Sequence, residues 1–134
     1  MEFEYGKKWL SRARSIDLEI KDKIYLIEAL YTCCGLQGIA YDKVSVISSP
    51  ENKLERIMAD INDVQKELKT LRKRKEVVIR EIQQKIEKLE ISPERTILMG
   101  FYIGCHSMNE IADDLGYVDA KYCYELRKKG ILKL

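Results

Sequence analysis

The final stretch of the chain gathers the side chains whose chemistry suits a phosphate or a base edge. Residues 120–134 carry five bases and one acid, whereas residues 94–119 carry five acids and one base. Lysine and arginine bind phosphates or donate to guanine, and glutamate accepts from cytosine. Lys121 and Glu125 are four residues apart, so a helix would place them on one face. This pattern favours a helix that meets DNA, although cations near a helix C-terminus can also complement the helix dipole, which would explain 127–129 but not Lys121.

Two sets of side chains are candidates for this contact. The N-terminal side of the last helix would face the bases in the major groove, and this set is Ala120, Lys121, Tyr122, Tyr124, Glu125 and Lys128. Phosphates would be met by the start of the preceding helix and by two cations further on, namely Ser107, Asn109, Arg127 and Lys129. For Tyr122 and Tyr124, packing at a helix edge is an equal alternative.

Three short helices are expected to position these residues within 92–134. Ser92 is a good N-cap and Pro93 suits the first helical position. Gly104 is expected to end this first helix in the left-handed conformation. Ser107 with Glu110 forms a capping-box pattern for the next helix. The turn at Gly116 then leads into the last helix, which Asp119 can cap.

The motifs in this segment carry a family resemblance. Ser92-Pro93-Glu94-Arg95, then Tyr102-Ile103-Gly104, then Glu110-Ile111-Ala112-x-x-Leu115-Gly116-Tyr117 and a terminal Ile-Leu-Lys-Leu resemble region four of bacterial sigma factors. The chain is most similar to sigma-region-four-like regulators of phages and prophages, in which a long helical part precedes this module. The segments 41–46 and 48–53 look like that family's connection between helices. The resemblance implies DNA-binding transcription regulation, with activation of late or packaging genes through contact with host RNA polymerase.

The chain departs from the family pattern just before the last helix. The family places a serine after Leu-Gly-Tyr, whereas Val118 stands there and Asp119 follows. If Asp119 takes the serine's role, Cys123 and Leu126 fall on the buried side and the turn is one residue longer. If Val118 takes it, Tyr122 and Glu125 would be buried instead. We favour the longer turn.

The first two thirds predict an all-α hairpin or coiled coil. Apolar residues recur in heptads over a helix of about 7–34, which Gly35 and Gly38 interrupt. Residues 50–90 predict one long helix with an apolar stripe that Lys75 interrupts, and a short strand is conceivable at 43–47. The resulting division is a helical hairpin over 1–91 and a three-helix helix-turn-helix domain over 92–134.

The unequal lengths of these two helices favour a homodimer. At about 1.5 Å per residue, the long helix would reach roughly 60 Å and the first only about 40 Å. We expect the surplus to pair with a second copy, with packing on the C-terminal module of the same chain as the alternative. Lys75 ends the basic run 72–75, which is either a phosphate-contacting patch or, more simply, a solvated face with a lysine that sets the helix pairing.

Several classes of function find no support. One histidine, scattered acids and no phosphate loop argue against an enzyme, and no cofactor is expected. Cys33, Cys34, Cys105 and Cys123 lack the spacing of a zinc site and are expected to be reduced. No apolar run approaches the length of a membrane span, and no signal-peptide pattern is present, so a cytoplasmic location in a bacterial host is expected.

The leading prediction is therefore a sequence-specific regulator that binds double-stranded DNA. Two alternatives stay open: a small DNA-recognition subunit of a phage packaging machine, and a helix-turn-helix module that binds a protein and not DNA. The net charge of +2 is weak for a nucleic-acid binder and keeps the last alternative open.

Overall fold

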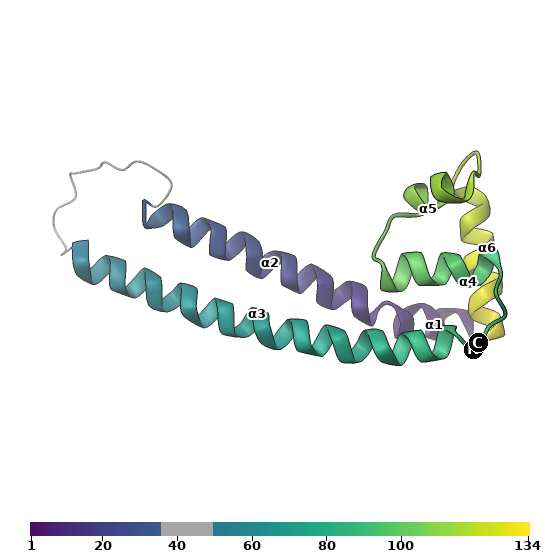
Figure 1. Ribbon diagram of the computed structural model, residues 1–134, viewed down its shortest axis with the longest axis horizontal. Helices are drawn as coiled ribbons and strands as arrows, with labels where there is room; N and C mark the ends of the chain where they lie inside the picture. Colours follow the sequence, from purple (N-terminus) through teal and green to yellow (C-terminus); the bar gives the residue numbers. More distant parts are fainter. Residues whose placement is uncertain (36–49) are drawn as a thin grey trace. The chain divides into compact units, whose positions relative to one another are not determined.

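The computed structural model describes residues 1–35 and 50–134, and every regular element in them is a helix. In chain order these are α1 (Phe3–Leu10), α2 (Arg12–Cys33), α3 (Pro50–Ile86), α4 (Pro93–Leu98), the π-helix η1 (Met99–Ile103), α5 (Met108–Leu115) and α6 (Lys121–Lys133) (Figure 1). The all-α prediction is thus confirmed for the described residues.

Two compact units divide the chain. Unit 1 is Met1–Asp17 with Arg74–Leu134, and unit 2 is Leu18–Lys73. The expected boundary near residue 91 differs from this division, because both the first seventeen residues and the end of α3 pack with the C-terminal helices. The C-terminal helices therefore share one unit with the N-terminus of the chain.

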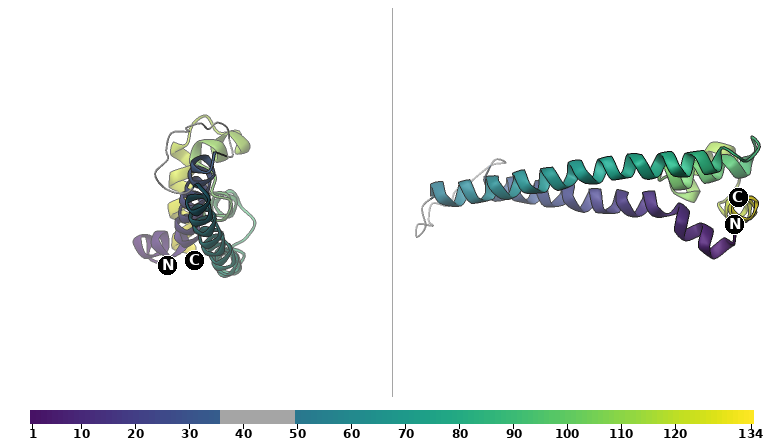
Figure 2. Two further views of the ribbon diagram at one scale, coloured as in Figure 1. Left: turned by 90° about the vertical axis from the view of Figure 1, so that its left-hand side faces the viewer. Right: turned by 90° about the horizontal axis from the view of Figure 1, so that it is seen from below.

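Unit 2 is built from the antiparallel pairing of α2 with α3, which lie side by side (Figures 1 and 2). The apolar stripe of each helix supplies the buried residues, Ile20, Ile61, Val64, Leu68 and Leu71. Lys23 Nζ and Glu67 Oε2 form an ion pair of 2.6 Å across the pair. The heptad pattern therefore finds its partner within this chain.

The same pairing continues in unit 1, where α2 begins and α3 ends. Lys75, which interrupts the apolar stripe of α3, meets Asp17 of α2 at 2.7 Å. Beyond them Ile82 and Ile86 are fully buried. Because the end of α3 is covered within the chain, the helix lengths no longer require a second copy to bury it.

Helix boundaries differ from the expected ones in three places. The first helix begins at Phe3 and breaks at Ser11, so α1 and α2 replace one helix over 7–34. The long helix ends at Ile86, ahead of the expected residue 90. Leu26, whose spacing in the sequence would extend the apolar stripe of the first helix, is 42% exposed. The strand considered at 43–47 lies outside the described residues.

An element that the sequence did not reveal packs against α6. A Cβ atom on Gly6 of α1 would collide with Ile131 Cγ2, so the absence of a side chain there lets the two helices approach closely. The N-terminal amine also donates to Leu132 O at 3.5 Å. Helix α1 thus supports the back of the helix that carries most candidate residues.

Candidate nucleic-acid interface

The candidate surface rests on a small apolar core between α4, α5 and α6. Its buried members are Ile97, Met108, Ile111, Ala112, Cys123 and Leu126. Phe101, Leu115, Tyr117 and Ala120 pack against it and are partly buried. Burial raises the pKa of the Cys123 thiol, which keeps it in the neutral form that suits this core. These contacts fix α6 by its inner side and leave its outer side to solvent.

Helix α4 begins with Ser92 as its N-cap, as predicted, but the helical segment that it opens does not end at Gly104 in the predicted way. Ser92 Oγ accepts from Arg95 N at 3.4 Å and Pro93 occupies the first turn. The helix then widens into the π-turns of η1, with Gly104 N donating to Met99 O. Gly104 keeps a right-handed φ of −76°, so the left-handed expectation is wrong. Glycine is needed there for space, because a Cβ would lie 2.8 Å from His106 Cδ2.

The start of α5 is held by side chains from its first turn. Ser107 Oγ accepts from Glu110 N at 3.1 Å, as the capping-box pattern predicts. Glu110 Oε2 in turn lies 2.9 Å from His106 Nδ1. The hydrogen bond with His106, followed by those with Ser107, lowers the pKa of the Glu110 carboxyl. Asn109 is exposed beside this cap.

The turn between α5 and α6 adopts the longer form. Gly116 ends α5 with a left-handed φ of 78°. Asp119 Oδ1 then accepts from Lys121 N at 2.9 Å and caps α6, while the preceding Val118 is fully solvent-exposed. Cys123 and Leu126 are buried, whereas Tyr122 and Glu125 are exposed. This settles the orientation of α6 in favour of Asp119 as the cap.

The outer side of α6 carries most of the base-facing candidates. Lys121, Glu125 and Lys128 repeat at helical spacing and are exposed, with Lys129 on one flank. Tyr122 is 48% exposed and its ring meets Tyr117 edge to face at 5.1 Å. Tyr124 is equally exposed on the other flank. Ala120 differs from these, since it packs against the core.

Arg127 lies in a packed environment. Its guanidinium carbon lies 5.2 Å from the centroid of the Tyr124 ring, 5.6 Å from that of Phe3 and 5.7 Å from that of Phe101. Its Nε is buried near the fully buried Tyr102. Burial raises the pKa of the Tyr102 hydroxyl and the Arg127 charge opposes that rise. Neither the Tyr102 hydroxyl nor Arg127 Nε has a hydrogen-bond partner among the described residues. Arg127 therefore holds aromatic rings from three segments together.

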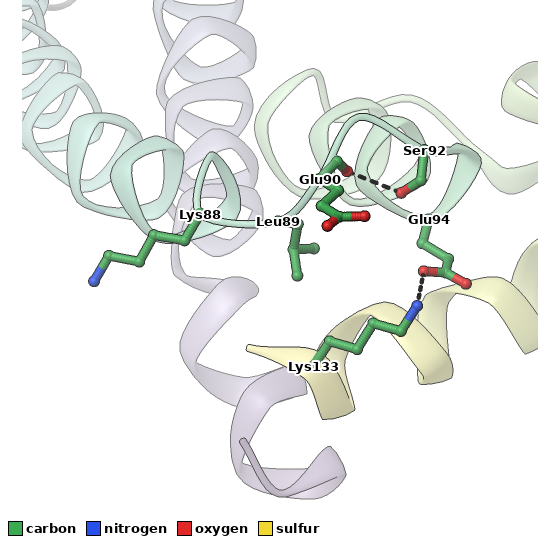
Figure 3. A pocket seen from close by; sticks show the side chains of 6 residues that line it. All are labelled: Lys88, Leu89, Glu90, Ser92, Glu94 and Lys133. Atoms are coloured by element: carbon green, nitrogen blue, oxygen red, sulfur yellow. Dashed lines mark hydrogen bonds and ion pairs between the residues drawn. The ribbon is translucent and has the colours of Figure 1, made fainter.

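A pocket of about 320 Å³ lies where the link after α3 meets the end of α6 (Figure 3). It is lined by Lys88, Leu89, Glu90, Ser92, Glu94 and Lys133. Lys133 Nζ reaches Glu94 Oε2 at 2.6 Å across it, and Lys88 points away. Lys133, one of the five bases near the C-terminus, is thus occupied by an ion pair within the unit.

Sequence reasoning missed one residue that positions this surface. Arg14 of α2 donates from Nη1 to Phe101 O at 2.8 Å and to His106 O at 3.3 Å, and its guanidinium stacks over the Phe101 ring. It therefore fixes the link between η1 and α5, just ahead of Ser107. No spacing rule could have found it, because its partners are backbone oxygens far along the chain.

Other kinds of site find no support in the described part of the chain. No group of histidine, cysteine or acidic residues there could hold a metal ion. None of the described helices is long and apolar enough to span a membrane. Comparison with protein-family models, with curated proteins and with solved structures finds no match.

Proposed function

We propose that the protein is a sequence-specific DNA-binding transcription regulator of the phage or prophage type, with α5 and α6 as its helix-turn-helix. The observation that carries the proposal is the exposed stripe on α6, where Lys121, Glu125 and Lys128 stand opposite a fully buried inner side. A rigid helix with long polar side chains on one face is what major-groove readout needs.

The start of α5 supports the phosphate side of this proposal. The Ser107 side chain is engaged by the cap, so its contribution would come through backbone N–H groups at the helix N-terminus. Asn109 and Lys129 are exposed and suit phosphate contacts. Arg127 is better suited to orient α6, because its Nε is buried among rings.

Gene activation through host RNA polymerase and a cytoplasmic site of action belong to the same proposal and rest on the family resemblance. The proposal also includes a homodimer, but the unequal lengths of the two long helices no longer argue for it. From Ile61 to Ile86 the apolar stripe of α3 is buried within the chain, and only its first part, with Leu54 46% and Met58 44% exposed, offers apolar surface to a second copy. A palindromic binding site would support such a dimer.

The test is selection of bound duplexes from random DNA by the full chain, followed by affinity measurements on the selected site. Lys121→Ala should lose about 1–3 kcal/mol and relax the preference at one base pair. Lys53→Ala is the matched control, since Lys53 is exposed on α3. Failure to select any sequence, or equal affinities of both variants and the parent chain, would contradict the proposal.

A second candidate is a module that binds a protein. Exposed apolar and aromatic side chains along the α5–α6 turn and α6 favour it, namely Val118, Tyr122, Tyr124 and Leu132. Retention on DNA that weakens steeply with salt supports the regulator, since phosphate binding releases counterions. Retention of a protein partner without any DNA binding supports the module.

A further inference from the structure

In unit 2, α3 carries basic side chains on a face that takes no part in the pairing with α2. Lys66, Lys69 and Lys73 are separated by three and four residues, so they share one face of the helix, and Arg72 flanks it. All four side chains are exposed. We call these four residues the α3 basic face.

Two of the acids nearby lie on another flank of α3, whereas Glu76, one turn after Lys73 on the same side, is paired with Arg80 at 2.8 Å. Glu67 is engaged with Lys23 of α2 at 2.6 Å, and Asp63 precedes it by one turn on the same side. Lys75, the last residue of the basic run 72–75, pairs with Asp17 and is therefore not part of the α3 basic face. Among the described residues, no ion pair involves the α3 basic face. Its charge is therefore not neutralised by an ion pair with any residue that the structure describes.

We propose that the α3 basic face binds the phosphate backbone of duplex DNA without reading its sequence. From Lys66 to Lys73 the helix rises about 10 Å, and duplex DNA repeats a phosphate every ~3.4 Å of axis on each strand. Long lysine and arginine side chains along this rise can meet two or more phosphates of one strand. Phosphate contacts of this kind raise affinity and position a protein, and they carry no base information.

This inference goes beyond the proposed function, because it concerns other residues and a different mode of binding. Readout by α6 predicts preference for a selected site. Binding by the α3 basic face predicts affinity for any duplex, with a steep dependence on salt. The two proposals can therefore fail separately.

The experiment measures binding of the full chain to a duplex of unrelated sequence over a range of salt concentrations. The test variant is Lys69→Ala with Lys73→Ala. The control is Lys53→Ala with Arg56→Ala, which removes the same charge from exposed positions of the same helix. Circular dichroism of both variants checks that the helices are intact.

We expect the test variant to reduce the slope of log affinity against log salt by about 2, since each lost phosphate contact removes ~0.9. Its affinity near physiological salt should fall by about an order of magnitude or more. The control should keep most of the salt slope and most of the affinity of the parent chain. Equal slopes for the two variants would overturn the proposal. So would a change in oligomer mass without a change in slope, because the face would then bind a second copy.

Lys121→Ala should reduce the salt slope for the unrelated duplex by less than the Lys69/Lys73 variant does, because it removes one positive charge and not two. If it abolishes that binding while the Lys69/Lys73 variant keeps it, α6 carries the non-specific affinity and the proposal for α3 fails. If no selected site exists but the salt slope still depends on Lys69 and Lys73, the proposal for α6 fails alone.

Discussion

Units 1 and 2 bury their side chains in different ways. Unit 2 is a helix pair whose best-covered residues keep some exposure, from 2% at Ile61 to 8% at Leu68. Unit 1 draws on α1, the ends of α2 and α3, and the C-terminal helices, and it contains fully buried residues such as Leu98, Tyr102 and Ile131. More layers around one core give fuller burial.

The difference also concerns what holds each unit together. In unit 2, repeated apolar positions and an ion pair between facing helices suffice. In unit 1, single polar side chains reach backbone atoms far along the chain, as Arg14 does at Phe101 and His106. A surface for recognising a specific ligand needs such fixed geometry, whereas a surface that meets phosphates through long flexible side chains does not.

Leucine truncation should give the largest contrast between the units. Leu98→Ala in unit 1 should lower the free energy of unfolding by about 3–5 kcal/mol, and Leu68→Ala in unit 2 by about 2–3 kcal/mol. The reason is that Leu98 is 0% exposed and Leu68 is 8% exposed, so the cavity in unit 1 is less able to relax. Urea denaturation measures both losses. Equal losses would show that the two cores are packed alike, and a larger loss for Leu68→Ala would show that the core of unit 2 is the tighter one.

The ion pair between α2 and α3 should show a smaller effect. Asp17 and Lys75 side chains are 18% and 23% exposed, so removing the carboxylate leaves a half-buried ammonium without this partner. We expect Asp17→Ala to destabilise the protein by about 1–3 kcal/mol. The double change Asp17→Leu with Lys75→Leu should recover most of that loss. If the double variant is less stable than Asp17→Ala, the ion pair stabilises the protein and does more than select how α2 and α3 pair.

Regular patterns in the sequence predicted what depends on local chemistry. The heptads predicted the helices and the residues that α2 and α3 bury, and the caps at Ser92, Ser107 and Asp119 form as expected. The choice of Asp119 over Val118 followed from asking which side chains could be buried, and burial of Cys123 and Leu126 confirms it. These features depend on neighbours within a few residues or on a strict period.

Features that depend on distant contacts were not predictable in this way. Helix α1 is stabilised by packing on α6, so Phe3 to Gly6 gave no signal of their own. The role of Arg127 depends on aromatic rings from α1 and η1, and its charge alone suggested a phosphate. The π-turns of η1 likewise arise where the helix packs under α5.

The pH dependence of stability separates the two units by sign, although each effect is small because the groups are exposed. In unit 1, hydrogen bonds from His106 and then Ser107 lower the pKa of Glu110 below 4.5. Its contribution is present above pH 4.5 and is lost as the pH falls through the folded-state pKa. In unit 2, the hydrogen bond to Glu67 raises the pKa of Lys23 above 10.5, so that contribution is present below pH 10.5 and is lost as the pH rises through the folded-state pKa.

Thermal unfolding of variants across pH should therefore show opposite signatures. Glu110→Gln should reduce the loss of thermal stability at acid pH and leave the loss at alkaline pH unchanged. Lys23→Gln should reduce the loss at alkaline pH and leave the loss at acid pH unchanged. His106→Ala should move the carboxyl pKa of Glu110 back toward 4.5, which carbon-detected NMR can follow directly. An acid limb that is unchanged in Glu110→Gln would mean that the cap of α5 does not depend on this carboxylate, and that the Ser107 hydroxyl and the Arg14 contacts hold the start of α5 without it.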